Sequence, residues 1–325
     1  MPEPLWVAES EAASLITIAD AIEVLAVAHR RYADGDAANM VKTQAQSGPS
    51  NLHAVGAVIA GEDVAGTKTW MHTPGGAQPL LILFSPSDGR VLAVIEAFAL
   101  GQRRTAATSA LATRELARPG SAVLALIGTG KQAVAQAEAV AAVRELTAIS
   151  IWGRDPERRR ACVEKVQERV EAYVREEPSL EAAFGHAEIV TLVTRAEAPF
   201  VDAALIRPGT HINGVGAILP NRREMTVEAV ARCDRIVVDS RPQAESASGE
   251  LRAAVEAGRL AWGDVRELGE LLGRPGLGRT DDEQVTFFKA MGVGIADVAL
   301  GAEVLRRARA EGAGAPLPTT QSAQH

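Results

Sequence analysis

The sequence has little that would suit a secreted, membrane-bound or nucleic-acid-binding protein. It contains only two cysteines, Cys162 and Cys233, which offer neither a disulfide framework nor metal-ligand spacing. No apolar run approaches the length of a membrane span, and the N-terminal stretch MPEPLWVAESEAA is acidic, unlike a secretory signal. The formal net charge of −7 argues against a nucleic-acid partner. These absences predict a cytoplasmic protein with no metal, membrane or nucleic-acid partner.

One stretch, Ala122–Ala133 (AVLALIGTGKQA), carries the clearest functional signal. Its six leading apolar residues are typical of a parallel strand buried on both faces. The Gly128-Thr129-Gly130 turn that follows can bring backbone N–H groups to a pyrophosphate at a helix N-terminus. Ala133 occupies the third small position of the G-x-G-x-x-G/A pattern. Because a strand pattern precedes the turn and a helical pattern follows it, we expect a dinucleotide site.

The patterns before and after this stretch differ, and 325 residues are enough for about two domains. Before it, a capping box at Thr17–Asp20 begins a helix that we expect to end near Tyr32. Short strands and a hairpin turn at Asp88-Gly89 then predict an antiparallel sheet. After it, alternating strands and helices predict a doubly wound parallel sheet. The expected strands are Val41–Ala45, Ala54–Ile59, Thr67–Met71, Leu80–Phe84 and Val91–Glu96 in the first sheet, and Val123–Ile127, Ile149–Trp152, Ile189–Val193, His211–Asn213 and Ile236–Val238 in the second.

Two basic positions suggest anion binding. The segment Gln102–Ser109 is expected to open a helix that ends near Leu116, and its arginines are either exposed residues at a helix start or an anion site. Arg154 follows the second strand of the parallel sheet, where an acid would bind a ribose 2′-hydroxyl and an arginine can pair with a 2′-phosphate. Asp155 is expected to cap a helix at Pro156–Val170. Arg154 therefore favours NADP over NAD.

A series of motifs extends in order from about Ala12 to Arg309. They are Arg103–Ala107, Ile127–Ala133, Ile151–Arg154, His211–Ala217, Val238–Ser240 with Gly249–Leu251, and Phe288–Gly292 with Ile295–Asp297. Together they resemble the ornithine cyclodeaminase/mu-crystallin family, and several are more specific to that family than to Rossmann proteins in general.

The resemblance implies an α/β fold with two domains. A Rossmann-type NAD(P)-binding domain would comprise residues 118–297. A discontinuous α+β domain for substrate binding and dimerisation would comprise residues 1–117 and 298–325, because the C-terminal helix, expected at Asp297–Glu311, returns to the N-terminal unit. A homodimer through the sheet of that unit is also implied. The tail from Gly312 is expected to be disordered.

The resemblance also assigns residues to the two ligands. Lys68 corresponds to the family's active-site lysine and Arg104 to its carboxylate-binding arginine, so both are predicted to be catalytic. Lys42 falls where members carry an arginine or similar base, and it is either a substrate residue or an ordinary surface lysine. Ile218 and Met291 complete the predicted substrate set. A guanidinium can hold a carboxylate in bidentate fashion, and a lysine of lowered pKa can pass a proton to the nitrogen being reduced. The predicted cofactor residues are Thr105, Gly128, Thr129, Gly130, Lys131, Gln132, Arg154, Thr194, Asn213, Val215, Gly216 and Met291.

Some polar residues keep more ordinary interpretations. Glu224 matches a recurrent family glutamate that we expect to fix a loop rather than to take part in chemistry. His211 begins a strand and is expected to be structural. His53 and His72 are either surface histidines or proton donors.

The loop Val215–Pro220 departs from the family pattern at a position that bears on the reaction. Ornithine cyclodeaminases carry a catalytic aspartate there, whereas this chain has Ile218. Expelling ammonia requires a carboxylate for proton transfer and for holding a second amine. Reduction of a cyclic ketimine requires only a bound carboxylate, a hydride and one proton, and an apolar residue suits a ring.

We therefore expect an NADPH-dependent reductase, with use of NADH left open, that converts Δ1-pyrroline-2-carboxylate or Δ1-piperideine-2-carboxylate to proline or pipecolate. One alternative is an ornithine cyclodeaminase or an alanine- or arginine-type amino-acid dehydrogenase of the same family. Another is a non-catalytic binder of a small molecule with NADPH.

Overall fold

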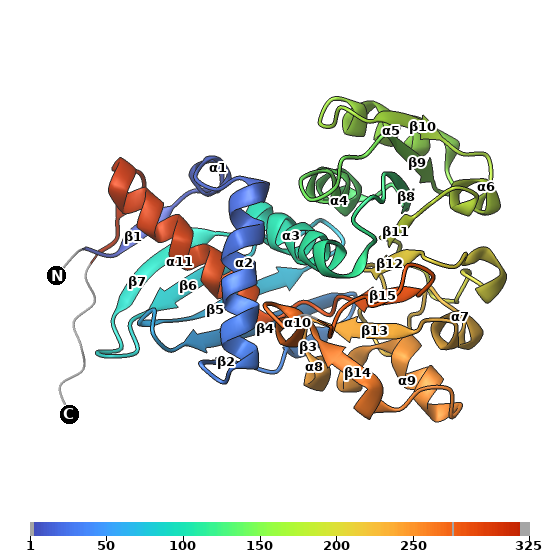
Figure 1. Cartoon of the computed structure of the whole chain (residues 1–325). Helices are drawn as coiled ribbons and strands as arrows, with labels where there is room; N and C mark the ends of the chain where they lie inside the picture. Colours follow the sequence, from blue (N-terminus) through green and yellow to red (C-terminus); the bar gives the residue numbers. More distant parts are fainter. Residues whose placement is uncertain (1–2, 275, 319–325) are drawn as a thin grey trace. The chain divides into compact units, whose positions relative to one another are not determined.

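The computed structural model describes residues 3–274 and 276–318, and the chain divides into two compact units. The N/C unit comprises Met1–Arg104 and Val293–His325, and the central unit comprises Thr105–Gly292. One boundary falls within α3 (Phe98–Leu116), and the other lies just before α11 (Gly294–Glu311) (Figure 1). The assignment of substrate and nucleotide functions to residues 1–117 with 298–325 and to 118–297 stays a prediction. Within the described ranges, no helix has the length and apolar character needed to cross a membrane.

The central unit contains an all-parallel sheet, which confirms the predicted fold class. Its order is β10-β9-β8-β11-β12-β15-β13-β14. The chain enters at β8 and builds outward on one side before returning to β11 on the other, so the strand order reverses between these two strands. The sequence patterns did not reveal β10, β14 or β15, of which β10 and β14 are short edge strands with polar residues. The strands are β8 (Val123–Ile127), β9 (Ala148–Trp152), β10 (Tyr173–Glu176), β11 (Ile189–Leu192), β12 (His211–Gly214), β13 (Arg235–Val238), β14 (Val265–Glu267) and β15 (Thr286–Lys289).

Apolar side chains on both faces of this sheet are buried under helices. Ile127, Val190 and Phe287 belong to one core cluster, whereas Leu124 and Ile149 belong to another. Full burial of each such side chain contributes roughly 1.5–3 kcal/mol. Asp155 caps α5 as predicted, although the helix ends at Gln167 rather than Val170. The helices are α4 (Lys131–Ala141), α5 (Pro156–Gln167), α6 (Leu180–Phe184), α7 (Val227–Ala231), α8 (Arg241–Ala247), α9 (Gly249–Glu256) and α10 (Leu268–Leu271), with 3₁₀ turns at Ala203–Leu205 and Trp262–Asp264.

The N/C unit contains a second sheet, of order β16-β1-β7-β6-β5-β4-β2, with β3 paired to β4. The pairs are antiparallel as predicted, except that β1 and β7 run parallel. The hairpin at Asp88-Gly89 is confirmed, and Gly89 adopts a φ of 73°. The predicted disorder from Gly312 is wrong for Ala315–Pro316, which pairs with β1, whereas residues 319–325 lie outside the described ranges. The strands are β1 (Leu5–Val7), β2 (Ala37–Asn39), β3 (Thr43–Ser47), β4 (Ser50–Ile59), β5 (Val64–His72), β6 (Leu80–Phe84), β7 (Val91–Glu96) and β16 (Ala315–Pro316).

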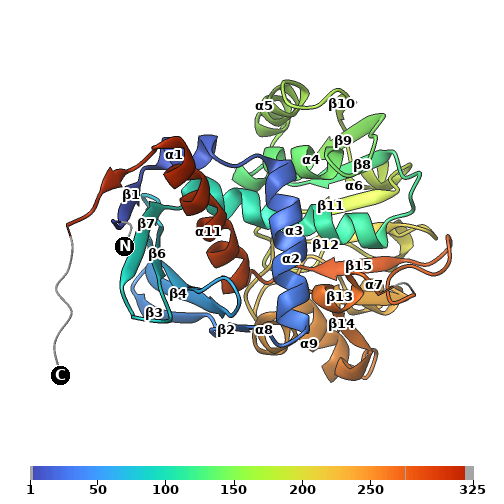
Figure 2. The ribbon, with the colours of Figure 1, turned by 60° about the vertical axis from the view of Figure 1, so that its left-hand side comes forward.

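Helix α11 packs on β4, β5 and β6 of this sheet, and Figure 2 shows it beside β4 and β6. Small residues allow the close approach, because a Cβ atom on Gly294 would lie 2.1 Å from the Gly56 carbonyl oxygen, and one on Gly301 would lie 2.3 Å from Leu81 Cδ2. The helix begins at Gly294, earlier than the predicted Asp297, which therefore lies in its first turn. Helix α1 spans Glu9–Ser14.

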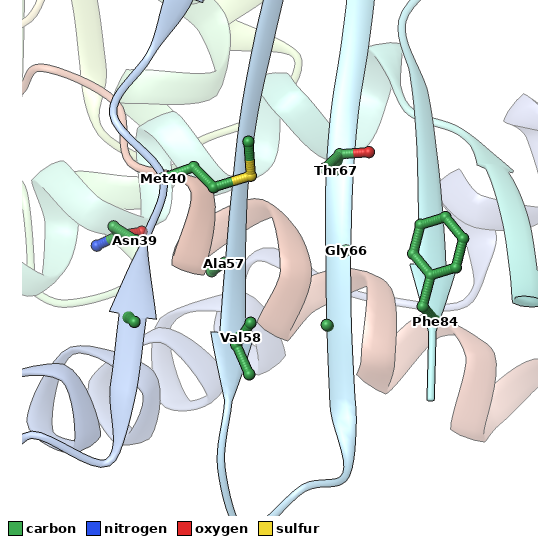
Figure 3. A pocket seen from close by; sticks show the side chains of 9 residues that line it. Asn39, Met40, Ala57, Val58, Gly66, Thr67 and Phe84 are labelled. Carbon is green, nitrogen blue, oxygen red and sulfur yellow. The ribbon is translucent and has the colours of Figure 1, made fainter. Parts of the chain in front are cut away.

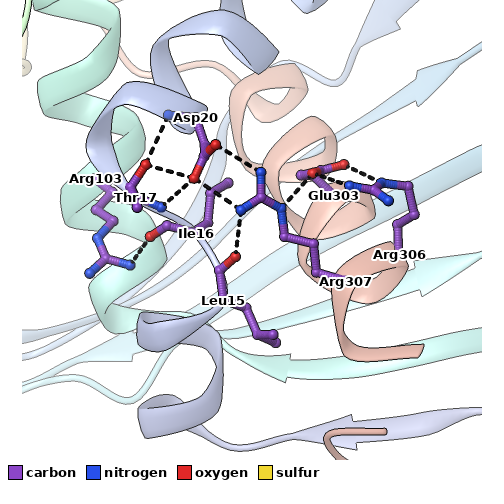
Figure 4. A network of polar contacts seen from close by, with 8 residues as sticks. All are labelled: Leu15, Ile16, Thr17, Asp20, Arg103, Glu303, Arg306 and Arg307. Carbon is purple, nitrogen blue, oxygen red and sulfur yellow. Dashed lines mark hydrogen bonds and ion pairs between the residues drawn. The ribbon is translucent and has the colours of Figure 1, made fainter. Parts of the chain in front are cut away.

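A polar network ties α11 to the start of α2 (Ile18–Ala33) (Figure 4). The predicted capping box is confirmed, since Thr17 accepts from the Asp20 N–H and Asp20 accepts from the Thr17 N–H. Arg307 lies 2.8 Å from Asp20 and 2.6 Å from Glu303. The hydrogen bonds from Arg307 and Thr17 hold the pKa of Asp20 well below its usual range. Helix α11 is thus held against α2 by charge as well as by packing.

Candidate active site

The start of α3 differs from the sequence-based expectation and changes the role of its arginines. The helix begins at Phe98, and the Glu9 carboxylate accepts hydrogen bonds from the Phe98 and Ala99 N–H groups. Gln102–Ser109 is therefore in the body of the helix, and the prediction that this segment opens the helix is wrong. Arg103 donates to the backbone carbonyls of Ala13 and Ile16. These contacts leave Arg104, on a different side of the helix, as the arginine that faces other charged side chains.

Lys68, Arg104 and Asp297 form a buried charge cluster. Lys68 lies on the side of β5 that faces α11, and its Nζ is 2.5 Å from Asp297 Oδ1. Arg104 Nε lies 3.2 Å from the same oxygen. Lys68 is 4% exposed and Asp297 is 1% exposed, so solvent screens the cluster little. Three elements distant in the sequence, β5, α3 and α11, thus supply one site.

Lys42 belongs to the same group of charges. Its Nζ lies 5.9 Å from the centre of the Trp70 ring, and Lys68 Nζ lies 5.2 Å from it. Trp70 in turn stacks on His53, with ring centres 4.8 Å apart. Burial, followed by the charge of Arg104, lowers the pKa of Lys42, and Asp297 opposes the shift. The structure therefore brings together the three predicted substrate-binding cations with one carboxylate, an excess of positive charge that suits an anionic ligand.

The protonation of Lys68 is poised near neutral pH. Burial lowers its pKa to about 8, the nearby charges of Arg104 and Lys42 act in the same direction, and Asp297 opposes them. Burial and the Lys42 charge also lower the pKa of His53, so this histidine stays neutral at neutral pH. Lys68 can consequently give up and regain a proton under ordinary conditions.

The glycine loop of the central unit has the geometry for a pyrophosphate. Gly128 has a φ of 122°, and a Cβ there would meet the Val193 carbonyl oxygen at 2.8 Å, so the close turn requires glycine. Gly130 is the N-cap of α4 and makes no side-chain cap, and a Cβ built on it would meet nothing within 4 Å. An open helix N-terminus of this kind fits a dinucleotide phosphate.

The neighbouring end of β9 places Arg154 near this loop. A Cβ on Gly153 would lie 2.9 Å from Thr129 Cγ2, which shows that the two turns are in contact. The side chain of Asp155 accepts hydrogen bonds from the Glu157 and Arg158 N–H groups as the cap of α5. Arg154 and Lys131 are exposed. Asp155 is thus engaged in capping α5, and Arg154 lies beside the expected ribose position.

The loop that carries Ile218 is held by buried charges. Glu224 accepts hydrogen bonds from the N–H and hydroxyl of Thr194 and from the N–H groups of Gly216 and Ala217. Lys289 Nζ donates to the Ala217 carbonyl at 2.5 Å. The prediction that Glu224 fixes the loop is therefore confirmed.

Glu250 completes this support. Its Oε1 accepts from the Glu224 N–H at 2.9 Å, and its Oε2 forms an ion pair with Lys289 Nζ at 3.0 Å. The ion pair is not aligned as a hydrogen bond. Lys289 is fully buried and Glu250 is 1% exposed, so the network belongs to the interior.

Several other residues predicted to bind cofactor or substrate are buried or half-buried. The Asn213 side chain is fully buried and bonds to Thr113, Thr191 and His211, so our proposed cofactor contacts exclude it. His211 also bonds to Thr286, in keeping with its structural interpretation. The Met291 side chain is 2% exposed within a core cluster, and its N–H is fixed by Asp239. Val215 is 8% exposed, whereas Thr105 and Ile218 are half-buried.

Sequence reasoning missed the roles of Asp297, Lys289, Glu250 and Asp239. Each occurs in a motif that carried the family resemblance, so the signal that could have found them was a charged residue inside an apolar motif. A charge in such a context requires a partner. The motifs identified no such partner along the chain.

Comparison with known proteins places these residues in context. The family model described as "Ornithine cyclodeaminase/mu-crystallin family" matches residues 4–312. The chain belongs to this family. A Δ1-pyrroline-2-carboxylate reductase of Bacillus cereus is 32% identical over 238 residues, 72% of each protein.

Two solved structures of the family superpose over nearly the whole chain. One is a Δ1-pyrroline-2-carboxylate reductase of Thermococcus litoralis with NADH and L-proline, with a TM-score of 0.92, 25% identity, and coverage of 96% of this chain and 100% of that one. The other is an archaeal alanine dehydrogenase dimer with bound NAD, with a TM-score of 0.90, 30% identity, and coverage of 98% and 99%. This member of the ornithine cyclodeaminase/mu-crystallin family is an NAD(P)-dependent oxidoreductase acting on imine or amino groups.

Proposed function

We propose that this family member is an NADPH-dependent reductase of cyclic ketimines, which converts Δ1-pyrroline-2-carboxylate or Δ1-piperideine-2-carboxylate to proline or pipecolate. The observation that carries the proposal is the cluster of Lys42, Lys68 and Arg104 around the single carboxylate of Asp297. The reductases of Bacillus cereus and Thermococcus litoralis support the substrate class.

The cluster provides what reduction of a ketimine requires. Arg104 and Lys42 supply positive charge for the substrate carboxylate, and a guanidinium adds directional hydrogen bonds. Lys68, with its pKa near 8, supplies the proton to the imine nitrogen. The bound nicotinamide cofactor supplies the hydride. Lys68 then recovers its proton from solvent.

The loop around Ile218 argues for a ready-made imine as substrate. Glu224 and Lys289 fix its backbone from within, and the segment Val215–Pro220 contains no acid. A cyclodeaminase would need a carboxylate there for the second amine, whereas a ring requires only an apolar surface.

For the cofactor, we propose contacts from Gly128, Thr129, Gly130, Lys131 and Gln132 to the phosphates and from Arg154 to the 2′-phosphate. We also propose Thr194, which follows β11, and Val215 and Gly216, which follow β12, and we retain Thr105 and Met291 as further candidates. Arg154→Ser is expected to reduce the preference for NADPH over NADH by about 10- to 100-fold, since one charge-assisted contact contributes about 1.5–3 kcal/mol. The ratio of kcat/KM values for the two cofactors measures this, and Arg158→Ser provides a control on the same exposed surface.

We further propose a homodimer through the open face of the N/C sheet. The face opposite α11 carries Leu52, Val58, Met71 and Phe84, of which the first three are at least 40% exposed. A pocket lined by Met40, Val58, Thr67 and Phe84 lies on this same face (Figure 3). An exposed apolar sheet face of this kind is typical of an interface between chains. Sedimentation analysis of Val58→Glu against wild type tests it, with a monomeric variant expected.

The proposed reaction is tested by following NADPH oxidation with each cyclic ketimine. Rapid oxidation with a cyclic ketimine, and none with pyruvate and ammonia, supports the reductase. Ammonia release from ornithine overturns it in favour of a cyclodeaminase. Ligand binding without turnover on any substrate overturns it in favour of a binder.

A second candidate is an amino-acid dehydrogenase, favoured by the likeness to the archaeal alanine dehydrogenase over nearly the whole chain. Both reactions need a bound carboxylate and a proton donor. They differ in the nitrogen source, so oxidation of NADPH with pyruvate that depends on ammonia identifies the dehydrogenase. The two free cysteines fit a reducing, cytoplasmic setting for either enzyme.

A further inference from the structure

The carboxylate of Asp297 has one oxygen that its neighbours do not use. Both Lys68 Nζ and Arg104 Nε contact Oδ1. Oδ2 is buried and accepts no hydrogen bond from any residue that the structure describes. A buried polar atom without a partner is costly, and a carboxylate oxygen can only accept, so the site is suited to a ligand that brings an N–H or O–H group.

The proposed substrate offers one such group. Its carboxylate is an acceptor and its ring carbons are apolar, so the nitrogen is the substituent able to donate once it carries a proton. Lys68 Nζ, the proposed source of that proton, lies 2.5 Å from the other oxygen of the same carboxylate. The N–H that proton transfer creates can therefore be accepted by the group next to the donor.

We propose that Asp297 Oδ2 binds the nitrogen of the substrate and so makes Asp297 a catalytic residue. This inference rests on the proposed function. Lys68 transfers a proton to the neutral imine, and the resulting N–H⁺ donates to Oδ2. The hydride then adds to the ring carbon, the C=N electron pair moves to nitrogen, and the neutral amine keeps its N–H on Oδ2. Lys68 takes up a solvent proton to complete the cycle.

The position of Asp297 suits this role. It lies in the first turn of α11, where the backbone N–H groups favour negative charge. Ile295 N–H is bound by the Asn39 side chain, which fixes the start of the helix. Gly294 against Gly56 leaves no space for the helix to shift toward the sheet. The carboxylate is therefore held in place before substrate arrives, and the nitrogen binds a preformed acceptor.

Two planar ligands test the inference by binding alone. Pyrrole-2-carboxylate and furan-2-carboxylate share the ring size and the carboxylate, but the first has an N–H where the second has an oxygen. Calorimetry on the protein saturated with NADP⁺ should give an affinity for pyrrole-2-carboxylate about 10- to 100-fold higher, the range expected for a hydrogen bond to a charged acceptor.

The variant Asp297→Asn should remove this preference. Its amide oxygen must face Lys68 and Arg104, which are donors, and this places the NH₂ group where Oδ2 was. A donor then faces the pyrrole N–H. If Asp297 only positions Lys68, the variant weakens both ligands equally and the preference survives, which overturns the inference. Glu303→Gln, which removes a carboxylate from the same helix outside the site, should leave the preference unchanged.

The outcomes separate this inference from the function on which it rests. Equal affinity of wild-type protein for the two rings overturns the role of Asp297 but leaves the carboxylate site intact. Binding of neither ring overturns both. Since wild-type protein alone gives the first comparison, the test does not depend on the stability of the variant.

Discussion

Lys68 and Lys289 are both buried lysines that face a carboxylate, one in each unit, yet their surroundings differ. Lys289 donates to a backbone carbonyl and faces Glu250 Oε2 at 3.0 Å in an ion pair without a hydrogen bond, while Glu250 Oε1 accepts from the Glu224 N–H. Lys68 shares a single oxygen of Asp297 with Arg104, and the other oxygen has no hydrogen bond. A network whose groups have partners holds a backbone in place, whereas one with a vacant acceptor is prepared for a ligand. The comparison thus separates an ion pair that holds a backbone in place from one that we propose binds a ligand.

Replacement of Lys68 should give the largest effect, and on activity alone. We expect Lys68→Met to lower kcat by about 10²–10⁴-fold, the usual contribution of a general acid. Asp297 keeps its contact with Arg104, so the free energy of unfolding in urea should change by less than about 2 kcal/mol. A kcat within tenfold of wild type would show that the proton comes from elsewhere.

Replacement of Lys289 should instead affect stability more than activity. Lys289→Met leaves Glu250 as a buried carboxylate without its cation, which costs about 3–5 kcal/mol of unfolding free energy. The double variant Lys289→Met/Glu250→Gln should recover part of the loss, because the neutral amide still accepts from the Glu224 N–H. Urea denaturation measures both. Equal stability of the single and double variants would contradict a structural ion pair.

The pH dependence of reduction sharpens the assignment of Lys68. Because the donor must be protonated, kcat/KM should be constant below pH 8 and fall about tenfold per pH unit above it. Asp297 raises the pKa of Lys68, so in Asp297→Asn the fall should begin at lower pH. If the fall instead reflected titration of the substrate, the pH profile of Asp297→Asn would match that of wild type. The variant therefore distinguishes titration of Lys68 from titration of the substrate.

The smallest effect is expected at the partly exposed network of α2 and α11 (Figure 4). Arg307→Met should cost about 0.5–1 kcal/mol of unfolding free energy, the usual range for such pairs. The lowered pKa of Asp20 means that this contribution is present above the unfolded-state pKa near 4 and is lost as pH falls below it. Urea denaturation at pH 7 and pH 3 checks the sign, since the difference between variant and wild type should shrink in acid.

The features predicted from sequence were those whose causes are local. The glycine turn after β8, the cap at Asp155 and the capping box at Thr17 depend on residues within a few positions of each other. The parallel sheet followed from alternating patterns, and Lys68 and Arg104 followed from the family resemblance.

The features that were missed depend on residues far apart in the chain. Asp297 lies 229 positions after Lys68, and no periodicity connects them. Likewise α3 begins at Phe98 because Glu9, 89 positions earlier, accepts from its first N–H. The strands β10 and β14 are short and polar because they lie at the sheet edges, so their pattern resembles that of loops.

The close packing of α11 against Gly56 has a consequence for folding during synthesis, because the N/C unit is assembled from both ends of the sequence. Residues 293–311 leave the ribosome after the whole central unit, whereas Lys68 is made long before it. Lys68 therefore cannot contact the Asp297 carboxylate until residues 293–311 have been synthesised. A truncated or partly translated chain would have the glycine loop without the assembled cluster of Lys68, Arg104 and Asp297, so the proposed reduction would require residues 293–311 to be in place.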